Sequence, residues 1–134
     1  RVEGNVVGKI NYGMMLLVSF TYGDTEKEID YLVNKVLNLR IFDDENGVMN
    51  KSILDINGEI LSISQFTLYA NTSKGNRPSY IDALKGEESI KLYDMFNEKL
   101  KSKIHTETGV FGAEMKVDFI NDGPITILLE KENK

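Results

Sequence analysis

The sequence predicts a single α+β domain with a mixed, mostly antiparallel sheet system and two helices packed on it. Apolar residues recur at helical spacing after residue 28 and again after residue 87, which predicts the helices. Several short apolar or alternating runs, bounded by Gly, Asn, Asp and Pro, predict the strands. A chain of 134 residues fits one domain with a modest core, so we treat residues 1–134 as one domain.

Composition and charge narrow the classes of function. Hydrophobic residues at 41% and charged residues at 28% are ordinary for a globular protein, and no apolar run is long enough for a membrane helix. The net charge of −5 argues against a protein that grips DNA or long tracts of RNA, although such a protein can still bind a single-stranded RNA end. The absence of cysteine removes disulfides and thiol nucleophiles, which is compatible with a cytoplasmic protein.

Both helices are predicted from local signals. Thr25 and Glu28 form a capping box, so we expect a helix to begin there and to end near Asn38. A second helix is expected at 87–103, with acidic residues near its positive N-terminus and lysines near its negative C-terminus. The expected buried stripes are Ile29, Leu32, Val33, Val36 and Leu37 in the first helix, and Ile90, Tyr93, Phe96, Leu100 and Ile104 in the second.

Strands are predicted wherever short runs alternate or are uniformly apolar. The run 14–22 is nearly all apolar, which predicts a central strand buried on both faces. Asn57-Gly58 is a strong hairpin signal, and a terminal hairpin is expected around Gly123-Pro124. The other expected strands are 6–10, 39–42, 52–56, 59–69, 113–120 and 125–130.

Hydroxyl and amide side chains recur on the predicted strand 59–69. A buried hydroxyl or amide without a hydrogen-bond partner would cost about 1–3 kcal/mol. These side chains must therefore either find partners within the protein or bind a ligand. A half-exposed strand that merely tolerates Ser and Thr is the structural alternative, and the pattern leaves both open. Gly123-Pro124 is likewise either an ordinary structural turn or a rigid corner that presents backbone groups to a ligand.

No metal site, cofactor or conventional catalytic set is predicted. The acidic turn 43–47 lacks the spaced ligands and terminal Glu of a calcium loop. His105 is the only histidine, and a surface residue is its simpler interpretation, although a catalytic base or metal ligand is conceivable. The loop 70–79, whose only charges are Lys74 and Arg77, is either solvated or a rim that faces phosphate.

Several blocks, taken together and in order, resemble the D-aminoacyl-tRNA deacylase family. They are Leu-Asn-Leu-Arg-Ile-Phe at 37–42, Ser-Gln-Phe-Thr-Leu at 64–68, Asn-Arg-Pro-Ser-Tyr at 76–80, Gly-Val-Phe-Gly-Ala-Glu-Met-Lys-Val at 109–117 and Asn-Asp-Gly-Pro-Ile-Thr at 121–126. The resemblance covers nearly the whole chain. Family members begin with a further strand-length segment before the stretch that matches Val2, so we expect that strand to be missing from residues 1–134.

The resemblance implies a layered β/β/α architecture and a homodimer with active sites at the interface. The implied reaction is hydrolysis of the ester between a D-amino acid and the 3′-terminal adenosine of tRNA, without cofactor or metal. The partners are then aminoacyl-tRNA and the second subunit. The candidate catalytic residues are Ser64, Gln65, Phe66 and Thr67, and the candidate substrate-binding residues are Arg77, Phe111, Met115, Gly123 and Pro124.

An aminoacyl ester is already activated, so a site can hydrolyse it by placing water and stabilising the oxyanion. The candidate oxyanion donors are the backbone N–H groups of Gln65, Phe66 and Thr67, and the Thr67 hydroxyl is the candidate positioning group. The resemblance suggests that the 2′-hydroxyl of the terminal ribose helps to activate the water. Strand alternation places Gln65 and Thr67 opposite Ser64 and Phe66, so these side chains share one site only if the strand bends.

Chirality is the expected role of Gly123-Pro124. We expect a cis bond between these residues, with both carbonyls accepting the substrate ammonium and leaving no space for an L side chain. Two other classes stay open: an editing deacylase with a different amino-acid preference, and a non-catalytic oligomeric module that binds a nucleotide-like ligand. A deacylation assay with D- and L-aminoacyl-tRNA separates the three.

Overall fold

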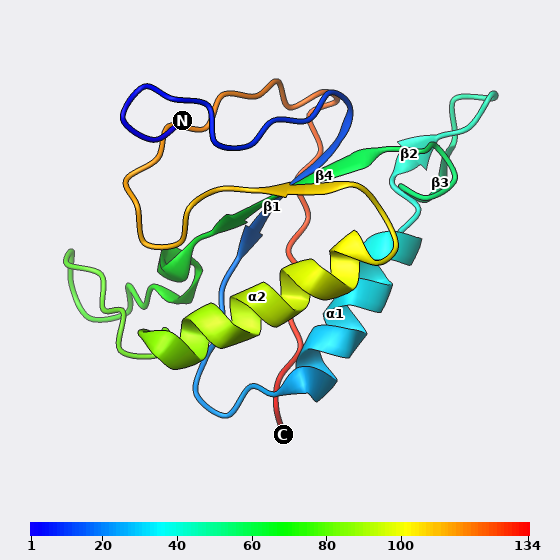
Figure 1. Ribbon diagram of the computed structural model, residues 1–134. Helices are drawn as coiled ribbons and strands as arrows, with labels where there is room; N and C mark the ends of the chain where they lie inside the picture. The colour runs from blue at the N-terminus through cyan, green and yellow to red at the C-terminus, as the bar shows by residue number, and fades with distance from the viewer.

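The computed structural model describes residues 1–134, with two α-helices, one 3-10 helix and five strands (Figure 1). The helices are α1 (Glu26–Asn38), η1 (Phe66–Tyr69) and α2 (Glu87–Lys101). The strands are β1 (Gly13–Val18), β2 (Phe42–Asp43), β3 (Met49–Lys51), β4 (Glu59–Ser64) and β5 (Thr106–Thr108). None of the helices is long and apolar enough to cross a membrane.

The main sheet is parallel, with β4 between β1 and β5. β1 and β4 pair from Gly13 opposite Glu59 to Val18 opposite Ser64. Parallel neighbours need long crossover connections, and α1 and α2 lie on these crossovers (Figure 1). The predicted mixed α+β domain with two helices is confirmed. The prediction of mostly antiparallel sheets is wrong, because only the short β2–β3 pair is an antiparallel ladder.

Both predicted helices form. Thr25 Oγ1 accepts from the Lys27 N–H at 3.3 Å and donates to the Glu28 carboxylate at 3.0 Å. The capping box thus differs from the predicted arrangement, because one hydroxyl makes both hydrogen bonds. α2 follows Gly86 and ends slightly before the predicted residue 103.

The apolar core lies between the helices and the main sheet. Most residues of the predicted stripes are buried there, whereas Ile90 is exposed. α2 is also tied to the central strand, because the buried Tyr93 hydroxyl donates to the Ser62 carbonyl at 2.8 Å. The buried members of the core cluster are Phe20, Ile29, Val33, Val36, Leu37, Phe42, Ile53, Ile60, Leu84, Tyr93, Phe96 and Leu100.

Two predicted features of the first half are wrong for reasons visible in the backbone. β1 forms an edge of the main sheet and exposes Leu17, so 14–22 is not a central strand buried on both faces. Residues 52–56 are not a strand, because the Gly58 N–H donates to the Ile53 carbonyl at 3.0 Å and closes a turn. The Asn57-Gly58 hairpin therefore does not form, and β4 starts directly after this turn.

The other predicted strands are shortened or absent. Residues 6–10 form no strand, 39–42 is reduced to β2, and 59–69 stops at Ser64. Residues 113–120 and 125–130 do not pair as a terminal hairpin. From 111 to 118, side chains do alternate between partly buried and exposed, as in a strand, although the backbone has no partner strand.

Candidate active site

A pocket of about 270 Å³ opens at the carboxyl ends of β1 and β4. The ends of these strands, the first half of α2 and the segment that follows β5 line it. Ligands bind at the carboxyl ends of parallel strands in open sheets, so its position suits a ligand site. The pocket brings together Ser64, Gln65, Phe66, Phe111 and Met115 among the predicted site residues.

The bend that strand alternation required is present after β4. The Gln65 N–H donates to the Val18 carbonyl at 2.8 Å, and the chain then enters η1. Because the strand has ended, Ser64, Gln65 and Phe66 can all line the same pocket.

The backbone donors of this bend are not equivalent. The prediction that the Gln65 N–H is an oxyanion donor is wrong, because the Val18 carbonyl already accepts that proton. The N–H groups of Phe66 and Thr67 form no hydrogen bond within the chain, as is usual for the first residues of a helix. Phe66 lines the pocket and Thr67 directly follows it, so these two N–H groups are the remaining candidate donors.

The Gln65 side chain fixes the Thr67 hydroxyl. Gln65 Nε2 donates to Thr67 Oγ1 at 2.6 Å. Thr67 is not itself among the residues that line the pocket, but it directly follows Phe66, which does line it. A glutamine amide cannot act as a general base toward the Thr67 hydroxyl, so Gln65 can hold this hydroxyl in place but cannot activate it as a nucleophile.

His105 lies at the opposite end of the sheet, near the amino end of β4. Its interpretation as a surface residue is confirmed. Its Nε2 is 3.3 Å from Glu107 Oε2 and 3.7 Å from Glu59 Oε2. Because Glu59 begins β4 and Ser64 ends it, the imidazole cannot reach the bend after β4. The pocket therefore contains no histidine base.

The far wall of the pocket is apolar. Phe111 packs on Tyr93 of α2 with ring centroids 5.7 Å apart. A Cβ at Gly109 would lie 2.5 Å from Met115 Sδ, so the absent side chain leaves space for the thioether. One edge thus carries hydroxyl and amide groups and the other carries aromatic and thioether groups, which suits a ligand with an apolar side chain and a polar backbone.

Arg77 and Gly123-Pro124 lie outside this pocket. Arg77 belongs to an exposed loop that two hydrogen bonds between Asn71 and Ser79 close, at 2.8 and 2.9 Å. The Gly123-Pro124 peptide bond is cis, as predicted.

The Asn121 side chain holds the turn around Gly123-Pro124. Its Oδ1 accepts from the Ile125 N–H at 3.2 Å, and its Nδ2 donates to Thr126 Oγ1 at 3.0 Å. The turn is therefore ordered by its own residues while remaining exposed.

Sequence reasoning missed two neighbours of Phe66. The Tyr80 ring packs edge-on against the Phe66 ring, with centroids 5.1 Å apart, and Lys85 Nζ lies 5.8 Å from the same centroid. Contacts between η1 and a distant loop leave no periodic signal, and only the Asn-Arg-Pro-Ser-Tyr block drew attention to Tyr80.

Comparison with known proteins identifies the family. A family model described as "D-Tyr-tRNA(Tyr) deacylase" matches residues 1–130. The chain belongs to this family. It is 52% identical over 132 residues to a "D-aminoacyl-tRNA deacylase" of Bacillus cereus (strain B4264), which covers 98% of this chain and 90% of the relative. The same values hold for the relative of that name in Bacillus thuringiensis (strain Al Hakam).

Two solved structures extend the comparison of this deacylase-family chain. The "c-Myc DNA Unwinding Element Binding Protein" matches with a TM-score of 0.93 and 40% identity, over 98% of this chain and 91% of that one. A "probable eukaryotic D-amino acid tRNA deacylase" matches with a TM-score of 0.67 and 16% identity, over 78% and 77% of the two chains, which is a likeness of fold alone. The predicted resemblance to the deacylase family is confirmed.

Proposed function

We propose that this protein hydrolyses the ester bond of D-aminoacyl-tRNA and releases the free D-amino acid and tRNA. The observation that carries this proposal is the position of the Ser-Gln-Phe-Thr block, whose first three residues line a pocket beside two free backbone N–H groups. The Bacillus relatives carry the name of this activity. Aminoacyl-tRNA as substrate would place the protein in the cytoplasm, where translation proceeds.

The proposed mechanism uses positioning and electrostatics. Water attacks the ester carbonyl carbon, and the Phe66 and Thr67 N–H groups stabilise the tetrahedral oxyanion that forms. The Thr67 hydroxyl, held by the Gln65 amide, orients the attacking water. The 2′-hydroxyl of the terminal ribose takes a proton from the water and passes its own proton to the 3′-oxygen, which leaves as a hydroxyl when the ester bond breaks.

We further propose a homodimer in which Gly123-Pro124 of one subunit reaches the pocket of the other. Three features support this arrangement: the turn is exposed, it lies outside its own pocket, and large apolar residues flank it. Ile120 is 93% exposed and Leu128 is 74% exposed, which is unusual for residues of this size unless a partner covers them. The carbonyls of the turn would then accept the substrate ammonium and exclude an L side chain.

A deacylation assay tests the proposed activity. Labelled D- and L-aminoacyl-tRNA, each prepared with several amino acids, are incubated with the protein, and release of the free amino acid is measured. We expect hydrolysis of the D-esters and survival of the L-esters. Hydrolysis of L-esters as well would indicate an editing deacylase of different preference, and failure on every ester would indicate a non-catalytic module.

Sedimentation equilibrium and a turn variant test the dimer. We expect twice the monomer mass for the unaltered protein. Ile120→Asp should shift the equilibrium toward monomer and lower hydrolysis in proportion, because a charge on an apolar interface is costly to bury. Asn46→Asp is the control, since it also adds a negative charge, but on an exposed polar residue of the turn between β2 and β3. Full activity in a monomeric variant would contradict the shared site.

A further inference from the structure

The backbone of Lys85 is anchored beside the pocket. The two residues before it, Ala83 and Leu84, are buried, and the Leu84 N–H donates to the Phe20 carbonyl at 2.9 Å. Gly86 follows with a φ of 77°, a left-handed value that suits glycine, and turns the chain into α2. Lys85 therefore projects an exposed side chain from a fixed position between the extension of β1 and the start of α2.

The Lys85 ammonium lies next to an aromatic ring of the pocket. Its Nζ is 5.8 Å from the centroid of Phe66, which lines the pocket and is 48% exposed. Tyr80 packs edge-on against the same ring and restricts its orientation. A cation over an exposed aromatic ring is held only weakly, so the ammonium keeps all three N–H donors for another ligand.

No carboxylate neutralises Lys85. It takes part in none of the ion pairs of the protein, although the chain carries 21 acidic and 16 basic residues. The neighbouring Glu87 and Glu88 lie in the first turn of α2, where they offset the helix dipole. At the other end of this helix, by contrast, Lys99 is paired twice, at 3.0 and 2.5 Å.

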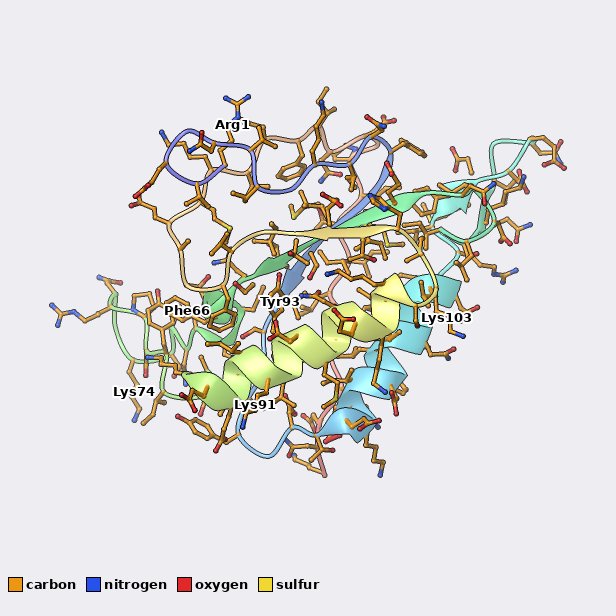
Figure 2. The ribbon with its side chains drawn as sticks, viewed as in Figure 1. Arg1, Phe66, Lys74, Lys91, Tyr93 and Lys103 are labelled. Carbon is orange, nitrogen blue, oxygen red and sulfur yellow. The ribbon has the colours of Figure 1, made fainter.

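Other unpaired cations lie toward the same end of the molecule. Figure 2 shows Lys74 and Lys91 at the end of α2 where Phe66 lies, and Lys103 at the opposite end. Exposed aromatic rings with interspersed cations are the usual means of holding a single-stranded nucleic acid, because the rings stack on bases and the cations meet the phosphates. This combination points to the single-stranded end of an RNA.

We propose that the Lys85 ammonium binds a phosphate of the single-stranded 3′ end of tRNA, next to the ester that occupies the pocket. The inference rests on the proposed function and extends it to the way in which the substrate is held. A phosphodiester fits because it is the anionic group nearest the terminal ribose, and because an ammonium is a compact partner for its oxygens. Lys85 is thus a substrate-binding residue that leaves the chemical step unchanged.

Kinetics on two substrates test this role. Lys85→Gln should raise KM for D-aminoacyl-tRNA about fivefold with kcat unchanged, and Lys85→Arg should restore the original KM. D-aminoacyl-adenosine has the same ester and no phosphate, so Lys85→Gln should hydrolyse it as the parent does. Lys35→Gln is the matched control, since Lys35 Nζ lies 5.6 Å from the Tyr31 ring on α1, away from the pocket.

A binding measurement separates this proposal from the proposed function. A labelled acceptor-stem minihelix with a single-stranded CCA end is followed by fluorescence anisotropy, which needs no hydrolysis. Lys85→Gln should weaken binding about fivefold and reduce the log–log salt slope by about 0.7, with no effect on a minihelix that lacks CCA.

Three results would overturn the role of Lys85: unchanged CCA binding, an equal loss on the blunt minihelix, or an equal loss of activity on the adenosine ester. The last result would mean that Lys85 acts by shaping Phe66. If the CCA effect is present and the parent hydrolyses no D-ester, the phosphate contact stands and the proposed function fails.

Discussion

At the scale of single residues, Gln65 joins the sheet to the candidate site. Its N–H closes the last hydrogen bond between β4 and β1, through Val18, and its side-chain amide holds the Thr67 hydroxyl. No base accepts the hydroxyl proton of Thr67, so that oxygen is poorly suited to attack an ester as a covalent nucleophile. It is well suited to orient water.

The first prediction follows from this geometry. Thr67→Val keeps the shape of the side chain and removes its hydroxyl, so it should lower kcat for D-aminoacyl-tRNA about tenfold to a hundredfold without abolishing hydrolysis. Thr72→Val, in the exposed loop, is the control and should leave kcat unchanged. Mass spectrometry of the quenched reaction should find no acyl group on Thr67, and finding one would contradict the role assigned here.

The second prediction concerns the acidic turn. The Val48 N–H, at 3.0 Å, and the Asn46 N–H, at 2.9 Å, both donate to Asp44 Oδ1, and the Val48 bond most strongly holds the pKa of Asp44 below its ordinary value. A lowered folded pKa stabilises the protein above the unfolded value of about 3.9, and this contribution is lost as pH falls through the folded pKa.

Asp44→Asn should therefore flatten the acid side of the stability profile. Urea unfolding from about pH 2 to 7 measures the free energy of unfolding, which should fall less steeply below about pH 4 in the variant. Thr72→Ala, which removes no titratable group, is the control and should keep the parental slope. If the free energy of unfolding fell equally steeply below about pH 4 in both variants, the role of Asp44 in acid stability would be contradicted.

At the scale of secondary structure, one hydroxyl closes the first turn of α1. Thr25→Ala should destabilise the protein by about 1–2 kcal/mol, because the Lys27 N–H loses its acceptor and the Glu28 carboxylate, in a residue 6% exposed, loses its donor. Thr25→Ser should recover most of this loss. Urea unfolding provides the measurement, and a cost no larger than that of Thr72→Ala would mean that the cap contributes nothing.

The helices were predictable because their signals are local. The capping residues and the apolar stripes of α1 and α2 lie within a few turns of the residues they organise, and the predicted burial of Ile29 and Tyr93 is observed. The sheet was mispredicted because its pairing is not local. Nothing in the sequence around Gly13 specifies Glu59 as its partner, and a hairpin is the default expectation for neighbouring strands.

The candidate site was likewise predicted where its signal is local in the sequence and missed where it depends on contacts between distant segments. The Ser64–Thr67 block was found from its resemblance to a family, and the bend that lets its side chains share a pocket was anticipated as a requirement. The occupied Gln65 N–H could not be foreseen, because it depends on Val18 in a strand assigned to the centre of the sheet. Lys85 was missed because its importance comes from a contact between separate elements.

At the scale of the whole molecule, a net charge of −5 limits how much of a tRNA this protein can hold. The exposed cations near the pocket allow about one to three phosphate contacts, so log kcat/KM against log salt should have a slope of about −0.7 to −2. The slope is measured with D-aminoacyl-tRNA over a range of salt concentrations, and the neutral ester on adenosine is the control. A slope that requires six or more contacts would contradict this small footprint.

The strand order β1-β4-β5 also governs how the chain can fold. β1 cannot gain a partner until the residues through Ser64 are available, and β5 waits for the whole of α2. During synthesis from the N-terminus, the apolar side chains of Met14, Leu16 and Val18 therefore stay uncovered while α1 and the β2–β3 pair are already able to form. Pairing between strands far apart in sequence slows folding, because the entropy cost of closing a long loop comes before any hydrogen bond between the strands can form. The main sheet thus assembles late and from β4 outward, with β1 able to pair before β5.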